Sequence, residues 1–472
     1  MANEWQQIQL GKVCLKIGSG ATPRGGKDAY RGGNTALIRS QNIHNDRFTR
    51  EGLAYINDSQ AHDLRNVVVE KNDVLLNITG DSVARCCQVD PDVLPARVNQ
   101  HVAIIRTQPD VLDARFLRYV LVSPLMQDHL LALASAGATR NALTKAMIES
   151  LGIQAPLIEE QRAIAHILGT LDDKIALNRR ANETLELMAR TLFKAWFVDF
   201  EPVRAKIECR WQRGHSLPGL PAHLYDHFPD RLVESELGEI PEGWEHVPFG
   251  SLLESTIGGD WGTDIPENDH SEVVSIIRGT DFPDVSSGGI GKVPTRYTTA
   301  KKLASRQLQA GDIVLEVSGG SPTQPTGRSI FISDAILERF SNAVVCASFC
   351  RRFQPKSRFL GTLAFMHLQY LYAAGGTWEY QNQSTGIANF QTTRFLESEM
   401  VVMPSAGLLG VFAAQAQSLL EKMSNNENLA LVKLRDTLLP KLISGELCVP
   451  DAETFMARVE HGATTNHTRS AS

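Results

Sequence analysis

Between residues 164 and 196, apolar side chains recur at alternating steps of four and three residues, interrupted by two asparagines. The positions of this stripe are Ile164, Leu168, Leu171, Ile175, Asn178, Asn182, Leu185, Ala189, Leu192 and Trp196. Such a spacing places a narrow stripe along one α-helix and is typical of a coiled coil. The pattern predicts a long helix over residues 158–200, of which the stripe from 164 to 196 spans roughly 50 Å at a rise of about 1.5 Å per residue. The asparagines in the stripe are expected to fix the pairing register.

A second stripe of the same kind lies near the end of the chain. Its positions are Leu409, Phe412, Ala416, Leu419, Met423 and Asn426, and after a slip in the spacing Leu431, Leu434, Leu438 and Leu442. We expect a second long helix over residues 405–447 that pairs antiparallel with the first. The slip after Asn426 leaves the exact register of this pairing open.

Ahead of each helical segment, short apolar runs alternate with Gly- and Pro-rich turns, a pattern typical of strands. The runs occur twice, as NDVLLNITG at 72–80 and GDIVLEVSG at 311–319, so that Asp73 aligns with Asp312 at an offset of 239. The same offset aligns Trp5 with Trp244, Gly11 with Gly250 and Arg39 with Arg278. One offset shared by four separate anchors indicates a duplicated module.

These patterns predict an α+β fold in which two pseudo-symmetric modules are separated by two long antiparallel coiled-coil helices. A chain of 472 residues is also too long for a single core. The expected order is a first module at 1–157, a helix at 158–200, a linker at 201–243, a second module at 244–404, a second helix at 405–447 and a tail at 448–472.

The charge balance adds little support for a nucleic-acid partner, because the formal net charge is −6. Residues 1–150 hold 17 Lys and Arg against 15 Asp and Glu, so the acidic excess lies later in the chain. A DNA-binding role would require the fold to gather basic groups on one face. The seven cysteines lack a zinc-ligand spacing, and no metal site is expected. No membrane-length apolar run or secretion signal is apparent, so we expect a cytoplasmic protein.

The loops of both modules carry side chains suited to DNA contact. These candidates are Arg24, Lys27, Arg31, Arg39, Gln41 and Asn42 in the first module, and Arg278, Lys292, Arg296 and Arg328 in the second. Arg can bond two acceptors of guanine, and Asn or Gln two groups of adenine, whereas Lys mainly meets phosphate. We therefore assign Lys27, Lys292 and neighbouring arginines to phosphates. The residues assigned to base edges are Arg24, Arg39, Gln41, Asn42, Arg278 and Arg328. Against this, charged loop residues are usually only solvated.

No catalytic motif is apparent. The chain lacks a Walker-type phosphate loop and the Asn-Pro-Pro or Asp-Pro-Pro loop of amino-methyltransferases. Two alternatives to DNA binding stay open: a protein–protein scaffold with a duplicated module, and an enzyme that acts alone. A scaffold predicts partner binding that is insensitive to salt and independent of DNA. A DNA-binding protein predicts DNA affinity that falls steeply with salt. An enzyme acting alone requires a cofactor pocket.

The helical segments PLIEEQRAIAHILGTLDDKIALNRRANETLELMARTLFKAWFVDF and LRDTLLPKLISGEL, with the words GSGATPRGG, NDVLLNITG and GDIVLEVSGG, resemble the DNA-specificity (S) subunit of Type I restriction–modification enzymes. The resemblance implies two target-recognition domains that each read one half of a split DNA sequence. It implies a helix pair that sets the gap and docks two modification (methyltransferase) subunits. Restriction (translocase and nuclease) subunits would join them, as part of phage defence.

The same resemblance implies a non-catalytic chain without cofactors of its own. S-adenosylmethionine, ATP and Mg are then expected on the partner subunits. The stripe residues that would form the helix pair and subunit interface are Ile164, Leu168, Leu171, Ile175, Asn178, Asn182, Leu185, Leu192, Trp196, Leu409, Phe412, Leu419, Met423, Asn426, Leu434 and Leu438.

Overall fold

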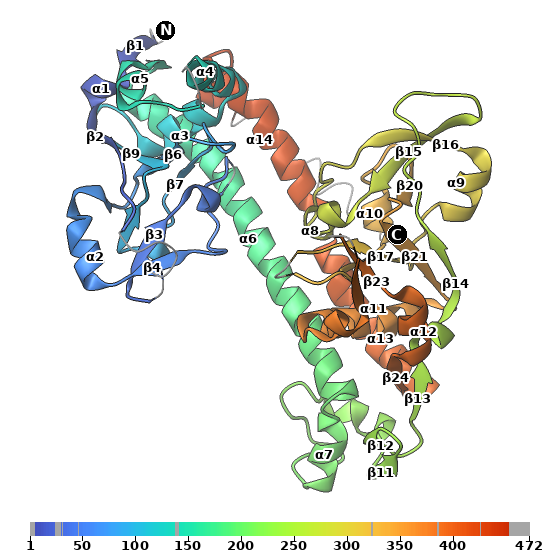
Figure 1. Ribbon diagram of the computed structural model, residues 1–472. Coiled ribbons are helices and arrows are strands. Elements are labelled where there is room, and N and C mark those ends of the chain that lie inside the picture. Colours follow the sequence, from blue (N-terminus) through green and yellow to red (C-terminus); the bar gives the residue numbers. More distant parts are fainter. Residues whose placement is uncertain are drawn as a thin grey trace. The chain divides into compact units, whose positions relative to one another are not determined.

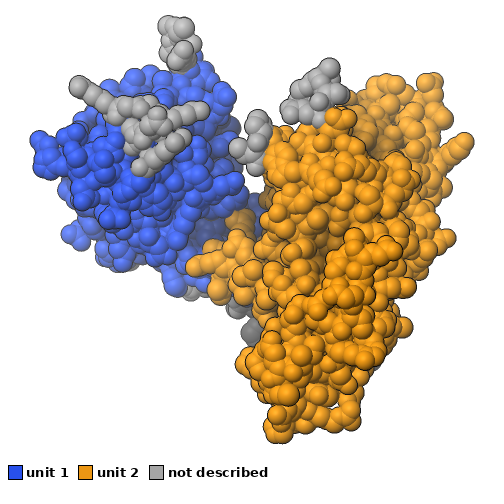
Figure 2. Space-filling model, turned by 60° about the horizontal axis from the view of Figure 1, so that its bottom comes forward, with its two compact units in different colours: residues 1–175, 431–472 blue, residues 176–430 orange. Residues whose placement is uncertain are grey.

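The computed structural model describes residues 5–23, 30, 32–45, 47–136, 141–321, 324–384, 387–424 and 426–452. The chain divides into two compact units, coloured in Figure 2: Met1–Ile175 with Leu431–Ser472, and Ala176–Ala430. Helices and strands are mixed in both units (Figure 1), which confirms the predicted α+β class. Each unit holds one module together with parts of both helical segments.

The first module contains two four-stranded sheets and a two-stranded ribbon. The antiparallel sheet has the order β2 (Cys14–Ser19), β9 (Val102–Thr107), β6 (Val74–Asn77) and β7 (Cys86–Gln88). The mixed sheet has the order β4 (Ala54–Ile56), β3 (Thr35–Ile38), β8 (Ala96–Val98) and β5 (Val68–Val69), with β3 and β8 parallel. The ribbon pairs β1 (Gln6–Gln9) with β10 (Gly152–Ala155).

The second module repeats most of this topology, with one strand fewer in its mixed sheet. Its antiparallel sheet runs β14 (Leu253–Gly258), β21 (Cys350–Pro355), β17 (Ile313–Glu316) and β19 (Ser329–Phe331). Its mixed sheet runs β16 (Thr295–Thr299), β15 (His270–Ile277) and β20 (Ala343–Cys346), with β15 and β20 parallel, and its ribbon pairs β13 (Glu245–Pro248) with β24 (Met400–Met403). A further sheet runs β18 (Ser318–Gly319), β23 (Ile387–Phe390) and β22 (Gln381–Ser384).

The duplication extends to a buried ion pair in each module. Arg106 Nε lies 2.8 Å from Asp73 Oδ1, and Arg352 Nε lies 2.7 Å from Asp312 Oδ2. Each carboxylate also accepts a bond from the backbone three residues earlier, at 2.7 Å in both modules. The aspartates anchor the turns that lead into β6 and β17, which explains why the words NDVLLNITG and GDIVLEVSG look alike.

Shorter helices cover the sheets and connect the strands. In the first module they are α1 (Leu10–Val13), α2 (Asp58–Asp63), α3 (Ala114–Val122), α4 (Pro124–Ser135) and α5 (Lys145–Ser150). In the second they are α8 (Phe282–Ser286), α9 (Ala300–Arg306), α10 (Asp334–Leu337), α11 (Arg358–Ala373) and α12 (Thr392–Ser398).

The first stripe lies on a single helix, α6 (Ile158–Phe197), as predicted. The second does not: α13 (Ala406–Met423) ends before α14 (Glu427–Ile443) begins, so the prediction of one long helix over 405–447 is wrong. The break coincides with the slip in the spacing.

The segment predicted as a linker at 201–243 is folded. It contains α7 (Glu201–Ile207) and a hairpin of β11 (Leu232–Ser235) and β12 (Gly238–Pro241). Trp211 is 1% exposed, and the Phe228 ring centroid lies 6.0 Å from it and 4.9 Å from Trp196. The aromatic side chains thus attach this segment to the last turns of α6.

Candidate nucleic-acid interface and docking surface

The predicted DNA-contacting residues fall into three groups. Arg24, Lys27 and Arg31 lie outside the described residues. Arg39, Gln41 and Asn42 follow β3, and Arg278 follows the equivalent strand β15. Lys292, Arg296 and Arg328 lie in or beside the strands of the second module.

Asn42 forms the turn that follows β3. Its side chain is fully buried, Oδ1 accepts from Arg39 N at 3.0 Å, and Nδ2 donates to the carbonyls of Thr49 and Glu51. All its hydrogen-bonding groups are therefore used inside the module. A base-reading role for Asn42 does not fit this burial, because a base edge would have to displace these bonds.

Arg39 and Gln41 lie beside Asn42 at the surface. Arg39 Nη2 donates to the Gly52 carbonyl at 2.6 Å, and Gln41 Nε2 lies 3.3 Å from the same oxygen. The Gln41 side chain is exposed. Its long bond to Gly52 is weak, so its amide can be reoriented toward another acceptor or donor at low cost.

In the second module the equivalent turn uses an ion pair. Asp281 stands where the first module has Asn42, and it accepts from Arg278 N, Nε and Nη2 at 2.8–3.0 Å. The Arg278 side chain also donates to the Lys292 carbonyl at 2.6 Å. Arg278 thus closes this loop, and the Lys292 side chain on the same loop is exposed.

Arg296 and Arg328 are also paired. Arg296 Nη1 lies 2.6 Å from Asp264, and its guanidinium stands 4.4 Å from the Trp261 ring centroid. Arg328 forms a two-point bond with Glu316, at 2.8 and 2.6 Å. These acidic partners have no signal in the sequence, because Asp264 and Glu316 lie 32 and 12 residues from their arginines and no local motif marks them.

The predicted helix interface is present within each unit. In the second unit the last turns of α6 pack on α13: Phe197 and Phe412 lie 4.7 Å apart between ring centroids, and Asn182 Nδ2 donates to the Met423 carbonyl at 3.1 Å. Phe412, near the start of α13, contacts the end of α6, whereas Met423, at the end of α13, contacts the middle of α6. The two helices are therefore antiparallel. Leu185, Leu192 and Leu419 pack around this core.

In the first unit, the first turns of α6 share a core with α14, through Ile164, Leu168, Leu171 and Leu438. Beside that core, Asp172 accepts hydrogen bonds from Arg118 at 2.6 Å, Tyr119 at 2.7 Å and Arg435 at 3.0 Å. Burial by itself would raise the pKa of Asp172, but these donors outweigh it and the pKa is lowered. Asp172 thus joins α3, α6 and α14 as a carboxylate.

The break between α13 and α14 has a specific environment. Arg339 donates to the Ser424 carbonyl at 2.6 Å and to Asn426 Oδ1 at 2.7 Å, and Asn178 donates to Glu427 at 2.9 Å. Burial lowers the pKa of Arg339 to about 10, which leaves it charged at neutral pH. Arg339 thus binds one of the carbonyls left without an intrahelical partner after α13, and the other two bonds join side chains around the break.

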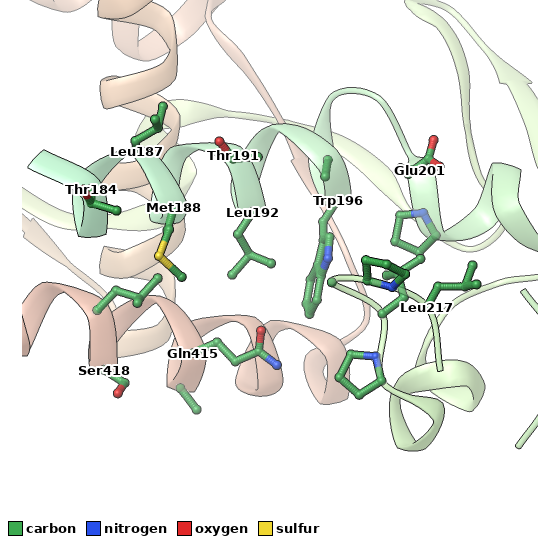
Figure 3. Close-up of a pocket in the computed structure, with 18 of the residues that line it drawn as sticks. Thr184, Leu187, Met188, Thr191, Leu192, Trp196, Glu201, Leu217, Gln415 and Ser418 are labelled. Carbon is green, nitrogen blue, oxygen red and sulfur yellow. The ribbon is translucent and has the colours of Figure 1, made fainter. Parts of the chain in front are cut away.

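A groove of about 1390 Å³ runs along the second half of α6. Figure 3 shows Met188, Leu192 and Trp196 pointing from α6 into the space bordered by α13 and the loop that carries Leu217. Leu187 and Met188 are 56% and 52% exposed. An apolar groove between helices is suited to an apolar helix of a partner.

Two kinds of feature are absent from the part of the chain that the structure describes. No group of three or more His, Cys, Asp or Glu side chains that could hold a metal ion occurs among them. None of the helices in the described ranges is long and apolar enough to cross a membrane.

Duplicated modules attached to paired helices define a class of chains with two similar α+β domains. Residues 2–187 match the family model for the Type I restriction modification DNA specificity domain.

Relatives extend the similarity to nearly the whole chain. The Type I restriction enzyme HindI specificity subunit of Haemophilus influenzae is 26% identical, over 94% of this chain and 100% of the relative. The MjaIX specificity subunit of Methanocaldococcus jannaschii is 24% identical, over 95% of this chain and 97% of the relative. The crystal structure of a Type I restriction–modification S subunit from M. genitalium covers 93% of this chain and 96% of that chain, with 14% identity and a TM-score of 0.49. The sequence relatives confirm the predicted resemblance to Type I specificity subunits.

Proposed function

We propose that this chain is the non-catalytic specificity subunit of a cytoplasmic Type I restriction–modification complex. Each module reads one half of a split DNA target, and the helix pair sets the gap between the halves. The observation that carries the proposal is the module duplication, in topology and in buried ion pairs, within a chain similar to specificity subunits over 94% of its length. Modules of one topology suit two half-sites of one duplex.

Among the predicted DNA contacts, Lys292 and Gln41 fit the proposal best because both side chains are exposed. Lys292 would meet phosphate and Gln41 a base edge. Arg39, Arg278 and Arg328 would have to exchange an internal bond for a DNA contact, and Arg24, Lys27 and Arg31 stay candidates from sequence alone. S-adenosylmethionine, ATP and Mg would be held by the modification and restriction subunits.

The proposal is tested by sequencing methylated adenines in cells that carry this chain and its modification subunit. The expected result is one split motif that disappears when the chain is deleted. In vitro, affinity for a duplex with that motif should fall steeply between low and high salt, since phosphate contacts release counterions. Methylation that persists unchanged without the chain contradicts the proposal and supports the scaffold alternative.

The gap-setting role predicts the effect of lengthening the helix pair. Seven residues inserted in α6 beside Asn178 preserve the stripe but change the separation of the modules by about 10 Å at 1.5 Å per residue. We expect the methylated motif to acquire a different gap, or to be lost, while both half-sites keep their sequences. An unchanged gap refutes the gap-setting role.

We further propose that the groove along α6 docks a modification subunit. Leu187→Asp or Met188→Asp should remove that subunit from the purified complex, because a charge in an apolar contact is costly to desolvate. Leu177→Asp is the matched control, since Leu177 is 61% exposed on the same helix but does not line the groove. Equal loss with all three variants indicates a general disturbance of α6.

A further inference from the structure

A tight turn connects the two main sheets of each module. In the first module it joins β8 to β9, and Val102 N donates to the Asn99 carbonyl at 3.2 Å. In the second it joins β20 to β21, and Cys350 N donates to the Ala347 carbonyl at 2.8 Å. The third residue of the turn is His101 in one module and Phe349 in the other. Both modules therefore present a ring at the same position.

The backbone of this turn is held in the same way in both modules. The His101 carbonyl accepts from Ile78 N at 2.9 Å, and the Phe349 carbonyl accepts from Val317 N at 2.9 Å. On the other side the turn faces Gly20 or Gly259, the residues that follow β2 and β14.

Those two glycines leave no room for a side chain. A Cβ on Gly20 would lie 1.8 Å from the Val98 carbonyl oxygen, and one on Gly259 would lie 2.1 Å from the Ala347 oxygen. The close approach fixes the path of each turn, so the ring at its third position is presented from a rigid frame.

The two side chains differ in chemistry. Phe349 is 59% exposed, and a ring that projects into water contributes little to its own module. His101 is half-buried, with Nδ1 2.5 Å from Thr79 Oγ1 and Nε2 3.0 Å from Gln100 Nε2. The first module thus offers a fixed imidazole with an exposed amide beside it, and the second offers an apolar ring.

We propose that His101 and Phe349 contact bases in the two half-sites, a step that rests on the proposed function. Phe349 supplies an apolar contact, either with a thymine methyl group or with a partly opened base step. His101 and the neighbouring Gln100 supply hydrogen bonds to a base edge. If each module used this position to contact one copy of the same modification subunit, the two residues should be alike in chemistry. If each module used it to contact a different half-site, the two residues should differ. The contrast between imidazole and phenyl therefore favours DNA over a protein partner.

The test uses the complex of the full chain with its modification subunit and a duplex that carries its methylated motif. Phe349→Ala should lower affinity for that duplex about tenfold, the usual cost of losing one base contact, and relax preference within one half-site only. Phe349→Leu should retain part of the affinity. His101→Ala should relax the other half-site. Affinity for unrelated DNA should not change in any variant.

Matched controls use rings exposed elsewhere in the same units. Phe359 is 48% exposed at the start of α11, and His129 is exposed on α4. Phe359→Ala and His129→Ala should leave both half-sites unchanged. Replacing each thymine of the half-site by deoxyuridine reveals a methyl contact, and 2-aminopurine fluorescence reveals an opened step. Either signal should vanish with Phe349→Ala.

Three outcomes overturn the inference while leaving the proposed function intact: wild-type recognition with Phe349→Ala and His101→Ala, equal loss with the control variants, or loss of the modification subunit from the Phe349→Ala complex. The last would assign the ring to a protein contact. If instead the wild-type complex prefers no sequence at all, it is the proposed function that fails.

Discussion

The two modules share their sheets and core contacts and differ in the residues at the ends of β6 and β17. Both contain the Asp–Arg ion pair, a glycine close to the sheet-connecting turn, the same order in the antiparallel sheet and three equivalent strands in the mixed sheet. At the end of β6 stands Asn77, which donates to the Ser40 carbonyl at 2.9 Å, whereas β17 ends in Glu316, which binds Arg328. The ion pair and the glycine are thus the same in both modules, whereas the residues at the ends of β6 and β17 differ.

The changes at these strand ends are coupled within each module. Gly279 stands in the second module where Ser40 stands in the first, and a Cβ at Gly279 would lie 2.4 Å from Glu316 Oε1. The larger glutamate thus requires the smaller neighbour. Such paired substitutions change the polar groups that a module presents without disturbing its core, as the proposed reading of two different half-sites requires.

The largest expected effect comes from breaking the shared ion pair. Asp312→Ala leaves Arg352, whose side chain is 8% exposed, without its carboxylate and should cost about 3–5 kcal/mol. Asp73→Ala should cost less, because Arg106 is 19% exposed and keeps Glu70 as a partner. Hydrogen exchange of the β17 and β6 amides measures the two effects separately.

A paired replacement serves as the control for that experiment. Asp312→Leu combined with Arg352→Leu removes both charges and should recover most of the stability lost in Asp312→Ala. A double variant as unstable as the single one would mean that the ion pair itself, and not the unpaired arginine, accounts for the loss.

The next effect separates the helix contacts of the two units. Asp172→Asn should destabilise the first unit by about 2–3 kcal/mol, since a neutral amide replaces the acceptor of charged and hydroxyl donors. The repeat places Leu420 at the equivalent position of α13, so the second unit should not respond.

The same variant has a predictable pH dependence. Because the folded-state pKa of Asp172 is lowered, its contribution is complete above the unfolded value of about 3.9 and is lost as the pH falls through the folded value. The stability difference between wild type and Asp172→Asn should therefore be constant near neutrality and shrink below about pH 4. Denaturant unfolding at several pH values measures it, and a difference that persists undiminished to pH 2 would falsify the role of the charge.

The smallest effect compares the two stripe asparagines. Asn182 is 8% exposed and binds the Met423 carbonyl, so Asn182→Ala should cost about 1 kcal/mol. Asn178 binds Glu427 in a more exposed position, and Asn178→Ala should change stability by less than about 0.5 kcal/mol. Equal costs in thermal unfolding would show that burial does not decide the value of these bonds.

Much of the fold could be predicted because its signals are periodic or repeated. The stripe from Ile164 to Trp196 predicted α6, and Asp73 aligned with Asp312 predicted equivalent strands. Site residues had no such signal. Asn42 has the side chain of a base reader but is consumed by its own turn, and Arg328 is neutralised by a glutamate twelve residues earlier in the chain.

The sequence by itself determined the duplicated α+β modules and the helical stripes, because local spacing dictates which face of a strand or helix is apolar. Only the tertiary structure decided where the second helix breaks and which loop side chains reach solvent. Those outcomes depend on contacts that local spacing does not mark. Arg339 binds the Ser424 carbonyl 85 residues away, Glu316 binds Arg328 twelve residues away, and Asp281 binds Arg278 within one turn. The tertiary structure also set His101 and Phe349 at one position, since a turn between two sheets is defined by both sheets together.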